Sequence, residues 1–176
     1  MIRTMLFHLE LWDAAFCLRL FRFGSKGTLD GLMRGLSRLG DGPLYGVLAL
    51  VVLLLNPVVA RWLVPAMALA FAVELPVQKI VKHGLKRRRP CHTIPEITNL
   101  VNMPDEFSFP SGHTAGAFIM AALLSRAVPQ IALPLYLLAG LVGLSRVYNG
   151  VHYPGDVLMG FVLGVASAQL ALTVVL

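Results

Sequence analysis

Charged residues are scarce in this sequence, and acidic ones are the scarcest: only 14% of its 176 residues are charged, and Asp and Glu together number 9. Soluble domains usually carry about a quarter charged residues, so this deficit argues against a soluble protein. The apolar residues, 57% of the chain, stand in blocks rather than at helical spacing, which is typical of membrane spans. The sequence therefore predicts an all-α, integral-membrane helical bundle, with residues 1–176 forming a single domain.

Cysteine is also rare, and neither Cys17 nor Cys91 has the paired spacing of a metal site, so we interpret both as free thiols. Charges spread through residues 1–23 leave no clean apolar core, so no signal peptide is expected. A net charge of +6 would suggest nucleic acid as a partner of a soluble chain. Here the cations flank apolar blocks, so we predict binding to the lipid bilayer and a lipid phosphate, and not to nucleic acid. The sequence does not indicate an oligomeric state.

The chain is expected to cross the membrane about five times. Residues 6–21 are apolar but interrupted by charges, which predicts a helix lying at the membrane surface within an N-terminal interfacial segment, residues 1–28. The first span ends at residue 55 and must recruit residues from the 30s, because a span needs about 20 residues. That would place Asp41 in or near the membrane, facing protein. The other spans are expected over residues 62–80, 113–128, 131–147 and 156–176.

One long polar stretch separates the second span from the third. It is rich in Lys, Arg, Pro and Asn and cannot lie in hydrocarbon. Loops of this length usually work as binding or active-site loops, so residues 82–112 are predicted to be an active-site loop. Because successive spans alternate in direction, the polar ends of several spans should meet at one membrane surface and form a single site.

Three polar blocks fall at these boundaries. They are residues 82–90 (KHGLKRRRP), residues 110–113 (PSGH), and Ser145–Arg146 followed by His152 and Asp156. In order and spacing they resemble the three signature blocks of the type 2 phosphatidic acid phosphatase superfamily, and every signature position is matched. The resemblance covers under half of the chain, and the apolar spans around it fit the lipid-phosphatase branch of the family.

The residue types in these blocks suit phosphoryl transfer. A phosphoryl group in transfer carries charge on its equatorial oxygens and needs fixed cations and N–H donors around it. Lys82, Arg89 and Arg146 can supply the cations, and the arginines can bind bidentately. Ser111 and Gly112 open a helix whose free N–H groups accept an anion, and glycine lets the backbone approach it closely. These five residues are the predicted phosphate-binding set.

The resemblance implies the catalytic roles. His152 would attack phosphorus to form a phosphohistidine, and His113 would protonate the leaving oxygen and later activate water. Both roles suit imidazole, whose pKa lies near 6.5. Asp156, one helical turn after His152, would accept the other ring N–H and orient it. With three cations around the phosphate, we expect no metal and no other cofactor, since the same cations would repel a metal ion.

The predicted function is hydrolysis of a membrane lipid phosphate. A polyprenyl (undecaprenyl) diphosphate is the first hypothesis; phosphatidate and phosphatidylglycerol phosphate are alternatives, because the blocks read only the phosphate. The superfamily also includes vanadate-dependent haloperoxidases and soluble acid phosphatases, against which the apolar spans argue. A non-catalytic lipid-binding or transport protein is a further alternative, but it would need only the cations and neither histidine.

Several polar residues outside the signature positions need separate interpretation. Lys86, Arg87 and Arg88 are expected to contact headgroups or solvent, as juxtamembrane cations commonly do. Glu74 and Gln78, inside the second span, are either functional or hydrogen-bonded to a neighbouring helix.

Two arguments about orientation disagree. The resemblance implies a multi-pass plasma-membrane protein with its active site on the extracytoplasmic face. The positive-inside rule opposes this, because the N-terminal arginines and the run over residues 82–89 share that face in a five-span arrangement. Our prediction follows the resemblance.

Overall fold

The computed structural model describes residues 2–24, 27–103 and 105–176, so positions 1, 25 and 26 of the predicted interfacial segment and position 104 of the predicted loop lie outside the described residues. Within these ranges the chain forms helices and no β-strand, which confirms the all-α prediction. The longer helices are α1 (Ile2–Gly24), α2 (Thr28–Arg38), α3 (Gly42–Leu55), α4 (Pro57–Leu85), α6 (Gly112–Ala127), α7 (Ala132–Tyr148) and α8 (Pro154–Val175). Two short elements are α5 (Pro90–Thr93) and the 3-10 helix η1 (Pro129–Ile131).

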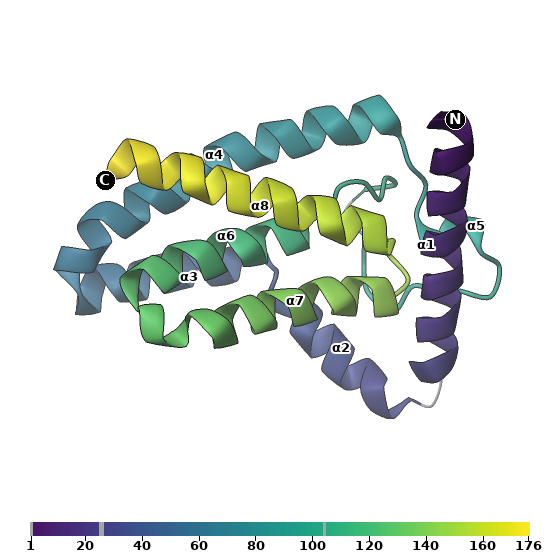
Figure 1. Cartoon of the computed structure of the whole chain (residues 1–176). Helices are drawn as coiled ribbons and strands as arrows, with labels where there is room; N and C mark the ends of the chain where they lie inside the picture. The colour runs from purple at the N-terminus through teal and green to yellow at the C-terminus, as the bar shows by residue number, and fades with distance from the viewer. Residues whose placement is uncertain (1, 25–26, 104) are drawn as a thin grey trace.

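Helix α6 is the centre of the bundle. Helices α4, α7 and α8 pack against it, and α3 packs against α4. Figure 1 shows α4, α6, α7 and α8 running side by side. Residues 114–123 of α6 are all buried, so protein rather than lipid surrounds most of this helix.

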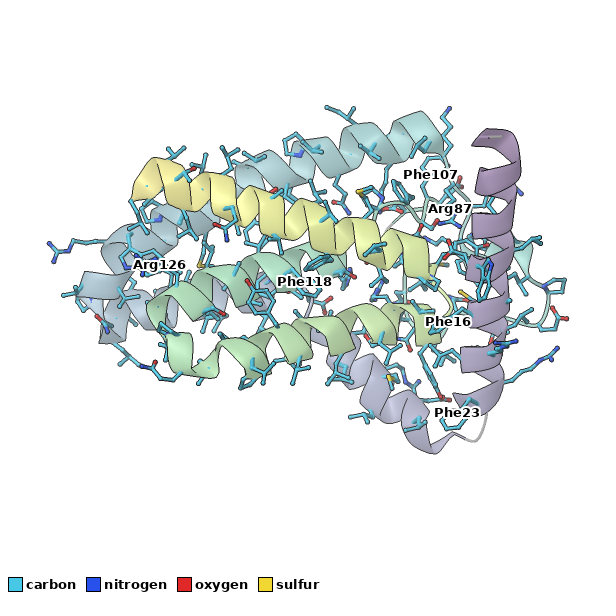
Figure 2. The ribbon with its side chains drawn as sticks, in the orientation of Figure 1. Phe16, Phe23, Arg87, Phe107, Phe118 and Arg126 are labelled. Atoms are coloured by element: carbon cyan, nitrogen blue, oxygen red, sulfur yellow. The ribbon has the colours of Figure 1, made fainter. Side chains whose placement is uncertain are left out.

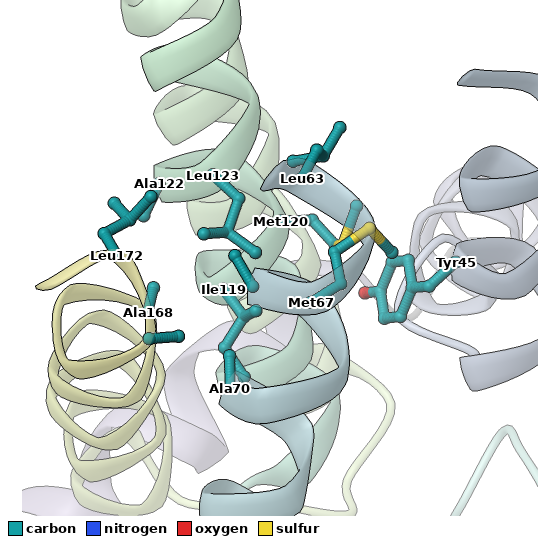
Figure 3. Packing of buried hydrophobic residues seen from close by; sticks show 12 residues of the cluster. Tyr45, Leu63, Met67, Ala70, Ile119, Met120, Ala122, Leu123, Ala168 and Leu172 are labelled. Atoms are coloured by element: carbon teal, nitrogen blue, oxygen red, sulfur yellow. The ribbon is translucent and has the colours of Figure 1, made fainter. Parts of the chain in front are cut away.

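The main apolar core lies between α4, α6 and α8. Leu63 of α4, Ile119 and Leu123 of α6 and Ala168 of α8 are all buried in it, as Figure 3 shows. In lipid, close van der Waals packing of this kind, rather than removal of apolar surface from water, holds helices together. The core therefore fixes the three helices whose ends carry most of the signature residues.

Two glycines let α8 lie directly against the backbone of α6. A Cβ at Gly160 would come within 2.5 Å of the Ser111 carbonyl oxygen, and one at Gly164 would collide with the Ala115 carbonyl oxygen. Small residues four apart are a common means of close helix contact in membranes. The contact brings the start of α8 to the start of α6, where the Ser111 N–H donates to the Asp156 carbonyl oxygen at 3.1 Å.

Over the described residues, three helical stretches are long and apolar enough to cross a membrane: α4, η1 with α7 (Pro129–Tyr148), and α8. They coincide with three of the five predicted spans. Helices α2 and α3 pass the same test only together, and they are bent by 57° at the break between them. The first predicted span does recruit residues from the 30s, but as a broken helix. α6 has only 16 residues, fewer than the about 20 that a span needs.

The N-terminal helix α1 runs across one end of the bundle instead of along it (Figure 1). It contacts α2, α7 and α8. Among its described side chains, Trp12 is 74% exposed, Phe16 and Phe23 are exposed as well, and Cys17 is buried against the bundle. This placement is the one expected of a helix that lies on the membrane surface.

Helix α4 is longer than the predicted second span of residues 62–80, since it runs from Pro57 to Leu85. Lys82, the first residue of the predicted 82–112 loop, therefore lies in the last turn of a helix. Gly112, the last residue of that loop, is the first residue of α6. The helix ends at Lys86 in the left-handed conformation, a common helix termination.

Candidate active site

The predicted site residues come together at the end of the bundle that α1 crosses. Six of them line one cavity of about 570 Å³: Lys82, Arg89, Gly112, His113, Arg146 and His152. The other two, Ser111 and Asp156, are completely buried. They lie beside Gly112 and His152 respectively. Segments far apart in the sequence thus supply one pocket.

The cations Lys82 and Arg89 hold an acidic residue that the sequence analysis did not single out. Lys82 Nζ lies 2.6 Å from Asp105 Oδ2, and Arg89 Nη2 lies 2.7 Å from Asp105 Oδ1. Burial alone would raise the pKa of Asp105, but the hydrogen bonds from Lys82 and Arg89 lower it overall, so the carboxylate is ionised. Asp105 has no fixed spacing to either cation, and no sequence signal marks it.

Arg89 is anchored on several sides. Its Nη1 donates to the Val151 carbonyl oxygen at 2.9 Å, and its Nε donates to the Asp105 carbonyl oxygen at 3.1 Å. Its side chain is 1% exposed. The same Nη1 lies 3.4 Å from His152 Nε2, so Arg89 borders the ring nitrogen that faces the cavity. The third cation, Arg146, is also buried and donates through Nη1 to Ser37 Oγ of α2.

The start of α6 opens onto the cavity. Ser111 is the N-cap, and its Oγ accepts from the Thr114 N–H, the usual arrangement for a capped helix start. A Cβ at Gly112 would collide with the side-chain amide of Gln78, so a side chain there would require Gln78 to move. The first N–H groups of a helix have no intrahelical partner, so this end of α6 can accept an anion.

His152 lies in the short connection between α7 and α8. Its Nδ1 is 3.6 Å from Asp156 Oδ2, within ion-pair range but longer than a hydrogen bond. Catalytic hydrogen bonds are often long before substrate binds. Burial lowers the pKa of His152 to about 3; Asp156 opposes this effect, and the nearby Arg146 adds to it. The ring is therefore neutral at neutral pH, with a lone pair available.

His113, at the start of α6, contacts the break between α2 and α3. Its Nε2 lies 3.0 Å from Asp41 Oδ1. Gly40 makes this approach possible, since a Cβ at Gly40 would lie 2.9 Å from the Cβ of His113. Asp41, predicted to lie near the membrane and face protein, thus meets a site histidine. No role was predicted for Asp41, and the glycines on either side of it are the sequence signal of a break there.

Glu74 and Gln78 precede Lys82 on α4 at four-residue spacing, and all three line the cavity. Residues at this spacing share one face of a helix. Glu74 is 1% exposed, and its Oε1 has no hydrogen-bond partner among the described residues. Within that part of the chain, Glu74 Oε1 therefore does not form the hydrogen bond to a neighbouring helix that was one of the two interpretations of this residue.

The same cavity has an apolar end between α3 and α4. It is lined there by Tyr45, Ala49, Met67 and Phe71. The cations and histidines occupy the opposite end. One continuous space therefore joins a polar, cationic part to an apolar part.

Arg87 is not a solvated charge, and the prediction made for it is wrong. It forms ion pairs of 2.7 Å with both Asp13 and Asp156. Lys86 and Arg88 are exposed, as expected. Cys17 and Cys91 are both free thiols.

The chain is similar in sequence and in fold to proteins of one phosphatase family. A family model described as the PAP2 superfamily matches residues 59–176. The chain is 38% identical over 133 residues to the decaprenylphosphoryl-5-phosphoribose phosphatase of Mycobacterium tuberculosis, covering 74% of this chain and 72% of that protein. It is 31% identical over 147 residues to the undecaprenyl-diphosphatase of Sulfolobus acidocaldarius, covering 83% and 70%. The crystal structure of a transmembrane PAP2 type phosphatidylglycerolphosphate phosphatase from Bacillus subtilis matches with a TM-score of 0.77 and 27% identity, over 93% of this chain and 84% of that one.

Proposed function

Because the chain belongs to the PAP2 superfamily and is a membrane phosphatase of that family, we propose that it hydrolyses a polyprenyl diphosphate or a related lipid phosphate through a phosphohistidine at His152. Phosphatidate and phosphatidylglycerol phosphate are the alternative substrates. The relatives support this range, since their names include a polyprenyl diphosphatase and a phosphatidylglycerophosphatase.

The observation that carries the proposal is the cavity with two unlike ends. Its cationic end gathers Lys82, Arg89 and Arg146 with two histidines, and its apolar end runs between α3 and α4. A soluble phosphate ester would use only the first. A lipid phosphate uses both, with its phosphate among the cations and the start of its tail against apolar side chains. A catalyst rather than a binding protein is favoured because the histidines stand beside the cations.

In the first step of the proposed reaction, His152 Nε2 attacks phosphorus, an N–P bond forms, and the bond from phosphorus to the lipid-side oxygen breaks. His113, protonated when the lipid phosphate is bound, donates a proton to that oxygen and becomes neutral. The cations and the start of α6 stabilise the charge on the equatorial oxygens. Asp156 stabilises the positive charge that develops on the ring of His152.

In the second step, His113 takes a proton from water, and the water oxygen attacks phosphorus. A new P–O bond forms, the N–P bond breaks, and inorganic phosphate leaves with His152 neutral again. Because three protein cations offset the charge of the phosphate, neither step draws on a metal ion.

We expect purified protein in detergent to release phosphate from at least one of three lipids in the presence of EDTA: undecaprenyl diphosphate, phosphatidate or phosphatidylglycerol phosphate. EDTA should change the rate by less than about twofold, since protein cations take the place of a Lewis acid. The ranking of the three lipids by kcat/KM would identify the substrate class. Strict dependence on added Mg²⁺, or no release from any lipid by folded protein, would contradict the proposal.

We also propose that the active site lies on the extracytoplasmic face of the plasma membrane. Arg87 lies at the α1 end of the bundle and Arg126 at the other (Figure 2). Arg19 and Arg22 of α1 and the basic run around Arg87 add to the positive charge of the α1 end. The positive-inside rule would put that end in the cytoplasm. The catalytic cations count little in that rule, because chemistry sets their position.

A cysteine placed at Glu96, in a variant lacking Cys17 and Cys91, should test the orientation. Glu96 is exposed and follows α5, at the end of the bundle that holds the site. We expect an impermeant thiol reagent to label this cysteine in intact cells. Labelling that occurs only after lysis would place the active site in the cytoplasm.

A further inference from the structure

An ion-pair chain outside the signature positions leads from helix α1 to the proposed catalytic residues. Arg87 Nη2 lies 2.7 Å from Asp13 Oδ2, and Arg87 Nη1 lies 2.7 Å from Asp156 Oδ1. The guanidinium carbon lies 4.0 Å from the centre of the Tyr153 ring, which fixes its plane. Figure 2 shows Arg87 between α1 and the start of α8. Arg87 therefore bridges two carboxylates with separate nitrogens, which a lysine could not reproduce.

The bridge leaves one oxygen of Asp156 for His152. Asp156 Oδ1 accepts from Arg87, while Oδ2 accepts from the Tyr153 N–H at 2.8 Å and lies 3.6 Å from His152 Nδ1. Asp156 is completely buried, so each contact limits how its carboxylate can turn. Arg87 itself does not line the cavity. Its effect on the reaction must pass through Asp156.

Asp13 fixes the other end of the bridge. Its Oδ1 accepts from the Gly155 N–H at 3.0 Å, so it is attached to the first turn of α8 as well as to Arg87. Asp13 lies outside the stretch that the family model matches, residues 59–176. The buried cluster of Cys17, Val147 and Tyr153 packs α1 against this end of the bundle independently of the ion pairs.

We propose that Arg87 and Asp13 are positioning residues, which hold the carboxylate of Asp156 in the orientation that His152 needs as a nucleophile. The inference rests on the proposed function. Helix α1, which lies across the end of the bundle that holds the site, thus sets the geometry of the nucleophile. Loss of the bridge slows attack on phosphorus and leaves phosphate binding intact, because neither residue reaches the cavity.

The test compares two variants with matched controls. Arg87→Gln removes the bridge, and Asp13→Asn removes the charge but keeps an acceptor of the same shape. As controls, Arg88→Gln removes an exposed cation next to Arg87, and Glu10→Gln removes an exposed acid from α1, the helix that carries Asp13. From the strength of charge-assisted hydrogen bonds, we expect kcat to fall about tenfold to a hundredfold in Arg87→Gln, with KM within about twofold of wild type. Asp13→Asn should show a smaller loss of the same kind, and both controls should retain wild-type kcat.

Two further measurements separate positioning from folding. Phosphohistidine formation, followed by rapid quench, should slow by the same factor as kcat in Arg87→Gln. Arg87→Lys should recover only part of the loss. If Arg87→Gln does not fold, the same kcat and KM measurements are made on Asp13→Asn, in which α1 stays packed through its apolar contacts. A kcat like that of Arg88→Gln would overturn the inference, and so would a rise in KM at unchanged kcat.

A measurement that does not depend on catalysis tests this inference separately from the proposed function. The protein is labelled with ¹⁵N-histidine, and its NMR spectrum is recorded. The ring N–H signal of His152 is assigned as the one that disappears in His152→Ala. This signal should shift or broaden in Arg87→Gln and should not change in Arg88→Gln. An unchanged signal contradicts the positioning role even if wild type hydrolyses no lipid. Absence of phosphate release by wild type, with the signal shifted as expected, would count against the function alone.

Discussion

Replacement of His152 with alanine is expected to lower turnover of lipid phosphate by at least about a thousandfold, because it removes the covalent route. The side chain is buried, with Nε2 facing the cationic cavity and Nδ1 facing Asp156. His113 lines the same cavity, but it comes from another helix and its Nε2 contacts Asp41, so we do not expect it to replace the nucleophile. The remaining cations would still bind phosphate, so KM should change far less than kcat.

The measurement is phosphate release in detergent, together with trapping of the phosphoenzyme from a labelled substrate. Wild type should carry acid-labile phosphate on histidine, and His152→Ala should carry none. His92→Ala, which removes an exposed histidine of α5, is the matched control and should behave as wild type. A His152→Ala protein with more than about a tenth of wild-type turnover would exclude a phosphohistidine at this position.

Arg89→Lys should be nearly as damaging as Arg89→Ala. The guanidinium makes contacts in three directions: to the Val151 carbonyl, to the Asp105 backbone and to the Asp105 carboxylate. Lysine keeps the charge but cannot form this fork of donors. Because loss of one preorganised donor to a transition-state oxygen costs about a hundredfold or more, both variants should lose at least about that much in kcat/KM.

The comparison is made with kcat/KM on the lipid that wild type hydrolyses best. The kcat/KM values of the two Arg89 variants should lie within about tenfold of each other, since both variants lose the bidentate contact that Arg89 would make to the phosphate. Arg88→Lys, one residue away and exposed, should leave the activity unchanged. Near-normal activity in Arg89→Lys would mean that a point charge is sufficient at this position and that the bidentate contact is not used.

The sequence was sufficient to predict the family and the all-α membrane bundle, because blocks of polar residues at the ends of apolar segments must meet at one surface. It also placed Lys82, Arg89 and His152 in one set, which the fold brings together around one cavity. Their roles remain predictions. Spacing carried this information, since each block covers no more than one short connection and the helix ends beside it.

Other contacts had no local signal. Arg87 stands in a run of basic residues, and only the fold distinguishes it from Arg88 by placing Asp13 and Asp156 beside it. Asp105 reaches the cations from a loop with no regular spacing. Such partners are set by tertiary packing, which a single sequence does not reveal.

Some helix boundaries in the structure also differ from those predicted from the sequence. Hydropathy ended the second predicted span at residue 80, whereas α4 continues to Leu85, because a helix can extend beyond its apolar stretch. The first predicted span recruits residues from the 30s, and its two helices are bent by 57° at the break between them. Gly40 lies at this break, and a Cβ there would come within 2.9 Å of the His113 Cβ.

Asp105 gives the site an internal counter-ion. Its carboxylate pairs with both Lys82 and Arg89, so in the proposed reaction a phosphate that binds the same donors must first displace it. The net attraction for an anion is then the difference between two sets of ion pairs, and it is much smaller than the number of cations suggests. On the proposed mechanism, the returning carboxylate would compete with inorganic phosphate for the cations and favour product release. Discrimination among anions would then depend on how well each one fits between the histidines, and much less on its charge.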